Sequence, residues 1–196
     1  MKTIYLFRHA EPIRLSDVQD SQWPLSAHGH KVASAVFERL REKKIGRVYT
    51  SPYLRAMETA RHACLPLSVD SRLSERTTGV ETPEMGDCWL RQYEDMEFKC
   101  DGGESFSEVR QRMNACLTDI LADMNDGEAV VVVSHAAAIC AFLMKYCCVN
   151  VTDRSTKSRE IIWCGEIVYT GSLPPLTGFA MSFQGNALES IVAITG

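Results

Sequence analysis

Two short apolar runs end in the same way, and they limit the folds open to this chain of 196 residues more than any other feature. Residues 3–7 are followed by Arg8-His9, and residues 129–133, four of them valine, are followed by Ser134-His135. An apolar run that stops at a polar pair is typical of a buried parallel strand. Parallel strands are joined by long crossovers that usually contain a helix, so these runs predict an α/β fold.

The rest of the chain alternates between helix and strand patterns. Apolar spacing predicts helices at 28–42, 51–63, 105–124 and 136–147. Ser51 and Pro52 are expected to begin the second helix, and Ser105-Phe106-Ser107-Glu108 has the form of a capping box for the third. Further strands are expected at 47–50 and 65–69, with a closing hairpin at 179–183 and 190–194.

These elements predict a three-layer α/β/α sandwich. Its central sheet is expected to be mainly parallel, with one antiparallel edge strand contributed by the closing hairpin. Residues 1–196 are expected to form a single domain. Within it, residues 71–103 are polar and irregular, with a short helix near 89–93, and we expect them to form a partial cap over the site. The pattern from Val149 to Thr177 specifies no clear element.

Composition and charge exclude several classes of protein. The formal net charge is −4, which offers no general attraction for nucleic acid or an anionic membrane. No apolar stretch approaches the length of a membrane span, and the first run is too short for a signal peptide. The eight cysteines show no Cys-x-x-Cys spacing, so we expect reduced core residues, no metal site and a cytoplasmic protein. The sequence leaves the oligomeric state open.

Charged side chains follow the predicted strands. Because the carboxyl ends of parallel strands meet at one edge of a sheet, Arg8, His9 and His135 are expected to lie together. Arg55 follows the strand at 47–50 by one tight turn and is expected at the same edge. Two guanidinium groups and two imidazoles form a small cationic pocket, and guanidinium binds phosphate through paired hydrogen bonds. The sequence therefore predicts a phosphate site.

Several segments carry these residues in a recognisable order. They are Leu6–Glu11, Trp23–Gly29, Thr50–Ala60, Leu73–Arg76, Gly103–Ser105 and Val133–His135. Together they resemble the motifs of the histidine phosphatase superfamily, which includes cofactor-dependent phosphoglycerate mutases and related phosphatases. The resemblance covers roughly residues 3–145.

The resemblance implies a role for each site residue. His9 is expected to attack phosphorus and carry the phosphoryl group as phosphohistidine. Arg8, Arg55 and His135, with the backbone N–H of Ala136, are expected to hold the phosphate oxygens. Nearby cations are expected to lower the pKa of His9 and keep its ring neutral. No metal or cofactor is required.

The acid that protonates the leaving group is expected to be Glu75. Glu11 and Glu104 lie in motifs that border the same pocket and are the alternative carboxylates. Glu104 is also a candidate for substrate contact.

The chain departs from the family pattern in three places. Ala10 and Ala136 stand where glycines are usual. Residues 13–16 lack an asparagine that contacts phosphate in many members, and Arg14 and Ser16 are the candidates to replace it. These departures affect substrate specificity more than phosphate chemistry.

The expected function is hydrolysis of a small phosphorylated metabolite. The main alternative is a cofactor-dependent phosphoglycerate mutase, and the others are a phosphoprotein phosphatase and a non-catalytic phosphate-binding module. Acidic residues crowd the segment that follows Glu75, namely Glu81, Glu84, Asp87, Glu94, Asp95, Glu97 and Asp101. Their charge is expected to repel a second phosphate and so to favour a phosphatase over a mutase.

Overall fold

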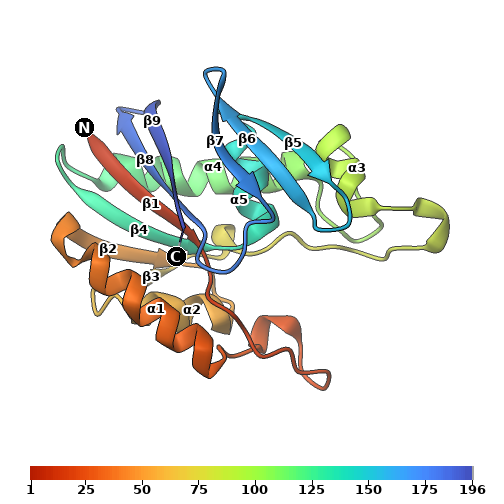
Figure 1. The fold of residues 1–196 in the computed structure, drawn as a ribbon, viewed down its shortest axis with the longest axis horizontal. Helices are drawn as coiled ribbons and strands as arrows, with labels where there is room; N and C mark the ends of the chain where they lie inside the picture. The colour runs from red at the N-terminus through yellow and green to blue at the C-terminus, as the bar shows by residue number, and fades with distance from the viewer. Residues whose placement is uncertain (196) are drawn as a thin grey trace.

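A computed structural model describes residues 1–195, apart from the side chain of Glu84, and has a six-stranded sheet at its centre (Figure 1). The strands of this sheet are β1 (Lys2–Arg8), β2 (Ile45–Thr50), β3 (Leu67–Val69), β4 (Ala129–Ser134), β8 (Gly178–Gln184) and β9 (Ala187–Ile194). Their order is β3-β2-β4-β1-β8-β9. The first four are parallel, whereas β8 pairs antiparallel with β1, and β9 pairs antiparallel with β8. The mainly parallel sheet is confirmed. One strand of it, β8, runs antiparallel to the others, but the edge strand beside it is β9, which runs in the same direction as β1.

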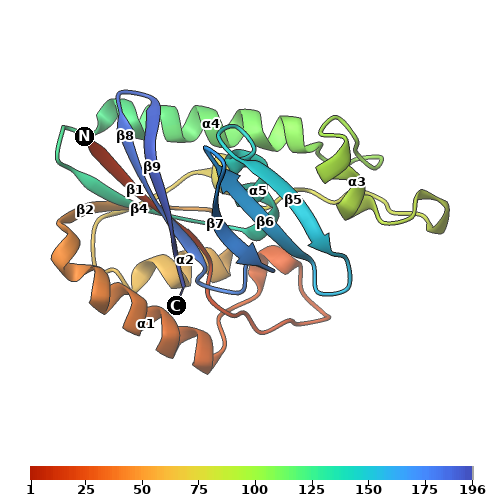
Figure 2. The same ribbon diagram turned by 45° about the horizontal axis from the view of Figure 1, so that its top comes forward.

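Helices cover both faces of this sheet, as the predicted sandwich requires (Figure 2). One face carries α1 (Ala27–Leu40) and α2 (Leu54–Arg61), and the other carries α4 (Phe106–Asp123) and α5 (Ala136–Leu143). The capping box at Ser105 is present and begins α4. Single turns of 3-10 helix are η1 (Asp20–Gln22), η2 (Arg41–Lys43), η3 (Ser71–Leu73) and η4 (Pro83–Met85). Within residues 1–195, no helix has the length and apolar character needed to cross a membrane.

The alternation of side chains along β1 explains why both faces are covered. Ile4 and Leu6 belong to the core beneath α4 and α5, whereas Phe7 belongs to the core beneath α1 and α2. Successive strand residues point to opposite faces, so an uninterrupted apolar run supplies both cores. The Phe7 and Phe37 ring centroids lie 6.4 Å apart and join β1 to α1.

A second, three-stranded antiparallel sheet occupies the region that the sequence pattern left unassigned. It consists of β5 (Cys148–Asp153), β6 (Ser158–Trp163) and β7 (Glu166–Gly171), and it lies near α3 (Cys88–Glu94). The residues of β7 are exposed or half-buried, so the strand lacks the apolar run that identifies buried strands in a sequence.

The expected start of the second helix is wrong. Helix α2 begins at Leu54, and its N-cap residue is Tyr53 rather than Ser51. The Ser51 hydroxyl accepts a hydrogen bond from the Tyr53 N–H at 3.2 Å and also pairs with His135. Ser51 therefore lies in the turn between β2 and α2, where its hydroxyl contacts His135, and the helix begins three residues later.

The prediction that the eight cysteines are unpaired core residues is confirmed only in part. All eight are free, and five are buried. Cys64, Cys148 and Cys164 are exposed, which corrects the expectation that all eight lie in the core.

Helix α1 begins against the backbone of Glu11. The Ser26 hydroxyl accepts a hydrogen bond from the Gly29 N–H at 2.9 Å and donates one to Glu11 Oε1 at 2.9 Å. A Cβ atom on Gly29 would lie 2.3 Å from the Glu11 carbonyl oxygen. Glycine is needed here because the helix passes so close to the segment that follows His9.

We expect Gly29→Ala to reduce the free energy of unfolding by about 1–3 kcal/mol, because the added methyl group displaces backbone. Helix propensity alone would make alanine the more stabilising residue here, so the steric effect and the propensity effect change the free energy of unfolding in opposite directions. Gly46→Ala is the matched control, since a Cβ atom on Gly46 meets nothing within 4 Å. Urea unfolding of both variants checks this prediction, and equal stability would contradict it.

Candidate active site

The register between β1 and β4 brings His9 and His135 together. Arg8 pairs with Ser134, so each histidine is the next residue along its strand. The His9 N–H donates to the Ser134 carbonyl at 2.9 Å, and the two imidazole centroids lie 5.0 Å apart. Both side chains are buried, with 4% and 0% exposure. The predicted meeting of these residues at one edge of the sheet is confirmed.

Two neighbours determine the tautomer of His9. Nδ1 lies 2.7 Å from the carbonyl oxygen of Ala10, which can only accept a hydrogen bond. Nε2 lies 3.1 Å from Arg55 Nε, which can only donate one. The proton is therefore on Nδ1, and the lone pair is on Nε2.

Burial is the main reason that His9 is neutral. Desolvation lowers the pKa of His9 to about 3, while the Ala10 carbonyl opposes this shift and Arg8 and Arg55 add to it. The direction agrees with the sequence-based expectation, but the neighbouring cations are the smaller cause.

Arg55 lies beside His9 at the start of α2. It is 5% exposed, and its Cζ atom lies 4.8 Å from the ring centroid of Tyr53. Its NH1 group donates to the carbonyl of Asp20, and its NH2 atom lies 3.5 Å from Asp20 Oδ2. Burial lowers the pKa of Arg55, while Asp20 and Glu75 raise it.

Arg8 lies at the end of β1 and is half-buried. Its NH1 group donates to the Leu173 carbonyl in the segment before β8. Burial lowers its pKa, while Glu75 opposes that shift and the charges of Arg159 and Arg55 add to it. Arg8 is therefore within electrostatic reach of both Glu75 and Arg55.

Two buried nitrogen atoms at this edge have no partner among the described residues, Arg8 Nε and His135 Nδ1. The other ring nitrogen of His135, Nε2, lies 2.8 Å from the Ser51 hydroxyl. Burial, followed by the charges of His9, Arg55 and Arg8, lowers the pKa of His135 well below its ordinary value. A buried polar atom without a partner is costly, and an oxyanion would supply the missing acceptors.

Glu75 lies at the N-terminus of α5. Its carboxylate accepts hydrogen bonds from the N–H groups of Arg76 at 2.8 Å, Ala138 at 3.0 Å and Ala137 at 3.3 Å. Three backbone donors thus hold this carboxylate beside the residues that follow His135.

Glu104 and Arg112 hold the Glu75 segment from behind. Arg112 donates to both carboxylate oxygens of Glu104, at 2.8 and 2.9 Å, and to the carbonyls of Ser74 and Glu75 at 2.8 and 3.2 Å. Burial raises the pKa of Glu104, but its bonds with Arg112 and Thr77 outweigh burial and hold the pKa below its ordinary value. Both Glu104 oxygens are thus engaged away from the cavity described below.

The other three candidate residues of the sequence analysis, Glu11, Arg14 and Ser16, are exposed, unlike the buried His9 and His135. Glu11 is exposed and pairs with Ser26. Arg14 is exposed near the Trp23 ring, with 6.0 Å from its Cζ atom to the centroid, and its charge adds to the lowering of the Arg8 pKa. Ser16 is exposed in a turn.

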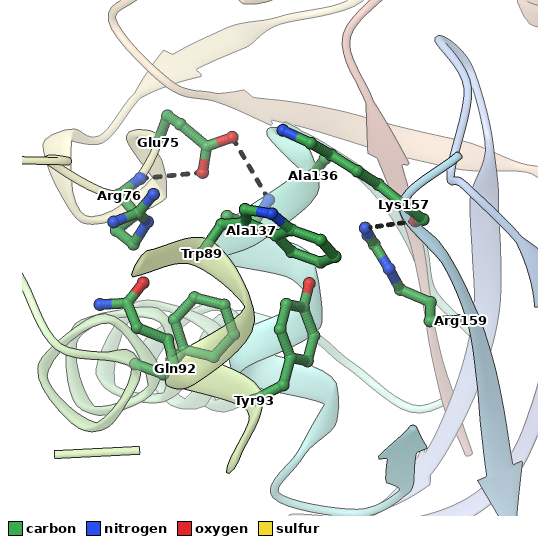
Figure 3. Close-up of a pocket in the computed structure, with 10 residues that line it drawn as sticks. Glu75, Arg76, Trp89, Gln92, Tyr93, Ala136, Ala137, Lys157 and Arg159 are labelled. Carbon is green, nitrogen blue, oxygen red and sulfur yellow. Dashed lines mark hydrogen bonds between the residues drawn. The ribbon is translucent and has the colours of Figure 1, made fainter. Parts of the chain in front are cut away.

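A cavity of about 190 Å³ adjoins Glu75 (Figure 3). Its lining residues are Glu75, Arg76, Trp89, Gln92, Tyr93, Phe106, Ala136, Ala137, Lys157 and Arg159. The acidic residues that follow Glu75 are exposed wherever their side chains are described, and none of them lines this cavity. Three cationic side chains line it instead, those of Arg76, Lys157 and Arg159. The expectation that acidic charge in residues 71–103 repels a second anion is therefore not supported.

Sequence reasoning missed several residues of this region. Lys157 and Arg159 belong to the turn before β6 and to β6 itself, in the unassigned region, and no motif marked them. Asp20 belongs to η1, which the sequence pattern did not identify. Ser51 lay within the recognised segment Thr50–Ala60, so its proximity to the site was available as a signal.

The chain is similar to several known proteins. It is 32% identical over 157 residues to the probable phosphoglycerate mutase GpmB of Salmonella choleraesuis (strain SC-B67), covering 71% of this chain and 72% of that one. A mycobacterial glucosyl-3-phosphoglycerate phosphatase superposes with a TM-score of 0.69 at 21% identity, over 99% and 97% of the two chains. A putative alpha-ribazole-5'-P phosphatase of Escherichia coli K-12 gives 0.68 at 18% identity, over 100% and 96%.

The structural matches are similar in fold alone, at these levels of identity. The family is established by sequence, because a model of the histidine phosphatase superfamily (branch 1) matches residues 4–156. This match contains His9, Arg55, Glu75 and His135. The chain therefore belongs to branch 1 of the histidine phosphatase superfamily.

Proposed function

We propose that this protein is a phosphomonoesterase that hydrolyses a small phosphorylated metabolite through a phosphohistidine on His9. The proposal rests above all on the state of that ring, which is buried and neutral, with its lone pair on Nε2. Around it lie two arginines and the unpartnered Nδ1 of His135, in the part of the chain that the structure describes. A neutral nucleophile among unsatisfied donors suits attack on a phosphate.

The first half-reaction forms a bond from His9 Nε2 to phosphorus as the bond from phosphorus to the ester oxygen breaks. Arg8 and Arg55 neutralise the charge on the transferring group, and the Ala136 N–H adds a donor. His135 Nε2 pairs with the Ser51 hydroxyl, and in this scheme the hydroxyl is the donor, so that Nδ1 carries the N–H that binds a phosphate oxygen. In the second half-reaction water displaces His9, and inorganic phosphate leaves.

Glu75 serves as acid and then as base. It gives a proton to the departing alkoxide and later takes one from the attacking water. Its charge acts on both Arg8 and Arg55, which supports a position beside the reacting group. Glu104 is a positioning residue in this scheme, because it acts through Arg112 on the Glu75 segment. Glu11 pairs with Ser26 at the start of α1 and has no role in the proton transfer.

A phosphoglycerate mutase is the second candidate. It is favoured by the curated relatives named as probable phosphoglycerate mutases and by the cationic lining of the cavity. Phosphate release measured with and without 2,3-bisphosphoglycerate separates the two functions. Bisphosphate-dependent isomerisation of phosphoglycerate without net hydrolysis would assign the mutase.

We further propose that residues 1–196 form one domain and that residues 71–103 act as its partial cap. Helix α3, within that segment, contributes Trp89, Gln92 and Tyr93 to the cavity wall. The small cavity favours a metabolite over a phosphoprotein. The eight free cysteines suit a reducing compartment such as the cytoplasm.

His9→Asn removes the proposed nucleophile, and we expect it to lower kcat for phosphomonoester hydrolysis by about 10³-fold or more. Rapid acid-free quenching followed by intact-mass spectrometry should detect a phosphoryl group on the wild type and none on the variant. His28→Asn, at an exposed position of α1, is the matched control. Retention of full activity by His9→Asn would refute the mechanism.

Glu75→Gln keeps the shape of the side chain but removes its proton-transfer capacity. We expect hydrolysis of alkyl phosphates to slow by about 10²–10⁴-fold, because a poor leaving group depends on the acid. Activated aryl phosphates need less protonation, and their phosphoenzyme formation should slow much less. Single-turnover kinetics of both ester types measure this step, and an equal loss for both would exclude Glu75 as the acid.

The buried state of His9 also predicts how stability varies with pH. Its pKa in the folded state is about 3, against about 6.5 in an unfolded chain. Between these values the unfolded state binds a proton that the folded state does not, so stability falls as pH falls. The slope approaches about 1.4 kcal/mol per pH unit for one such group. Urea unfolding from pH 7 to 4.5 should show a shallower fall for His9→Asn, and identical slopes would contradict the shift.

A further inference from the structure

The cavity beside Glu75 combines positive charge with aromatic surface. Lys157 Nζ lies 5.3 Å from the Trp89 ring centroid, and Arg159 Cζ lies 5.4 Å from that of Tyr93. Figure 3 shows the Lys157 side chain extending from the β6 side toward the side that holds Glu75. With Arg76, three cationic side chains and one carboxylate, that of Glu75, line this cavity. The cavity therefore suits an anion attached to an apolar or planar body.

Arg159 is held in place but not fully paired. It is 5% exposed, and its guanidinium donates to the Lys157 carbonyl at 2.8 Å and to Cys140 Sγ at 3.2 Å. Its Nε atom is buried and has no partner within residues 1–195. A buried guanidinium with an unused donor indicates a missing acceptor.

Gln92 supplies the complementary group. Its amide nitrogen donates to the carbonyls of Phe98 at 3.0 Å and Glu104 at 2.8 Å, and these partners identify which end of the amide is nitrogen. Its Oε1 atom is buried and lacks a donor in the described chain. A hydroxyl or N–H group of a ligand would satisfy it.

The position of the cavity relates these groups to the proposed chemistry. Glu75 and Ala136 line the cavity. The charges of both Glu75 and Arg159 act on the pKa of Arg8, which places Arg8 near the same space. An alcohol that leaves phosphorus and takes its proton from Glu75 therefore departs beside this space. The cavity volume of about 190 Å³ suits a compact group.

We propose that this cavity binds the leaving group of the substrate, and that this group is a compact hydroxy acid with an apolar or planar body. Lys157 and Arg159 bind its anion, Gln92 Oε1 accepts a hydrogen bond from it, and Trp89 and Tyr93 cover its apolar face. This inference rests on the proposed phosphatase function and names its substrate class. The anion is a carboxylate or a second phosphate group, which share the same recognition chemistry.

Matched aryl esters test the proposal. We compare kcat/KM for 3-carboxyphenyl phosphate and 3-carbamoylphenyl phosphate, which differ in charge but hardly in shape. The ratio of the two should fall by about tenfold in Lys157→Gln, because a charged contact is lost. Comparing ratios between proteins cancels the difference in leaving-group reactivity. Adding 1,3-phenylene bisphosphate shows which anion is preferred.

Arg154→Gln is the matched control, because this substitution also removes one positive charge. Arg154 is exposed in the same turn as Lys157 but does not line the cavity. Its ratio should equal that of the wild type. Arg159→Gln should lower the ratio as Lys157→Gln does, and circular dichroism verifies its fold. A ratio unchanged in Lys157→Gln, or lowered equally in Arg154→Gln, would overturn the proposal.

A binding measurement separates this proposal from the phosphatase function itself. Calorimetric titration with 3-hydroxybenzoate and 3-hydroxybenzamide needs no turnover. Tighter binding of the benzoate, abolished by Lys157→Gln, supports the cavity assignment even if neither ester is hydrolysed. Ester hydrolysis by the wild type without any preference for the benzoate would refute the assignment and leave the phosphatase function standing.

Discussion

The parallel pairing of β1 with β4 is the constraint on which the rest of the site depends. Phe7 pairs with Val133 and Arg8 with Ser134, so the two histidines leave the sheet at the same level. Strand β2 joins β4 with Thr50 opposite Val133, which delivers Ser51 and then α2 to the same edge. A shift of one residue between β1 and β4 would exchange the two faces of β1 and separate the rings. The same shift between β2 and β4 would displace Ser51 and the start of α2.

Burial determines the electrostatics of this edge more than the neighbouring charges do. Both imidazoles are neutral because desolvation disfavours their protonated forms, and the nearby arginines reinforce that preference. The site thus has permanent positive charge on guanidinium groups and uncharged rings between them. One NH1 group of each arginine is engaged by the backbone, Arg8 at the Leu173 carbonyl and Arg55 at the Asp20 carbonyl.

The fold and the centre of the site were largely predictable, because strong local patterns carry them. The valine run of β4 and the capping box of α4 specify their elements without help from the rest of the chain. The β5–β7 sheet was not predictable, since it has only three buried positions, and one of them, Arg159, is not apolar. The position of Ser51 was misjudged because a strand end and a helix cap favour the same residue types. The cavity wall requires Lys157 and Arg159 to meet α3 through tertiary packing, which no spacing along the chain encodes.

The contact between Asp20 and Arg55 has a consequence for any anion that reaches this edge. Asp20 presents both its carbonyl and its carboxylate to the Arg55 guanidinium. Part of this guanidinium therefore already interacts with acceptors of the protein itself. An anion that binds Arg55 would have to displace this internal competitor, and the same groups could return when it departs. The affinity of the site for a free anion would therefore be weaker than its number of cations suggests, which would suit product release in the proposed phosphatase cycle.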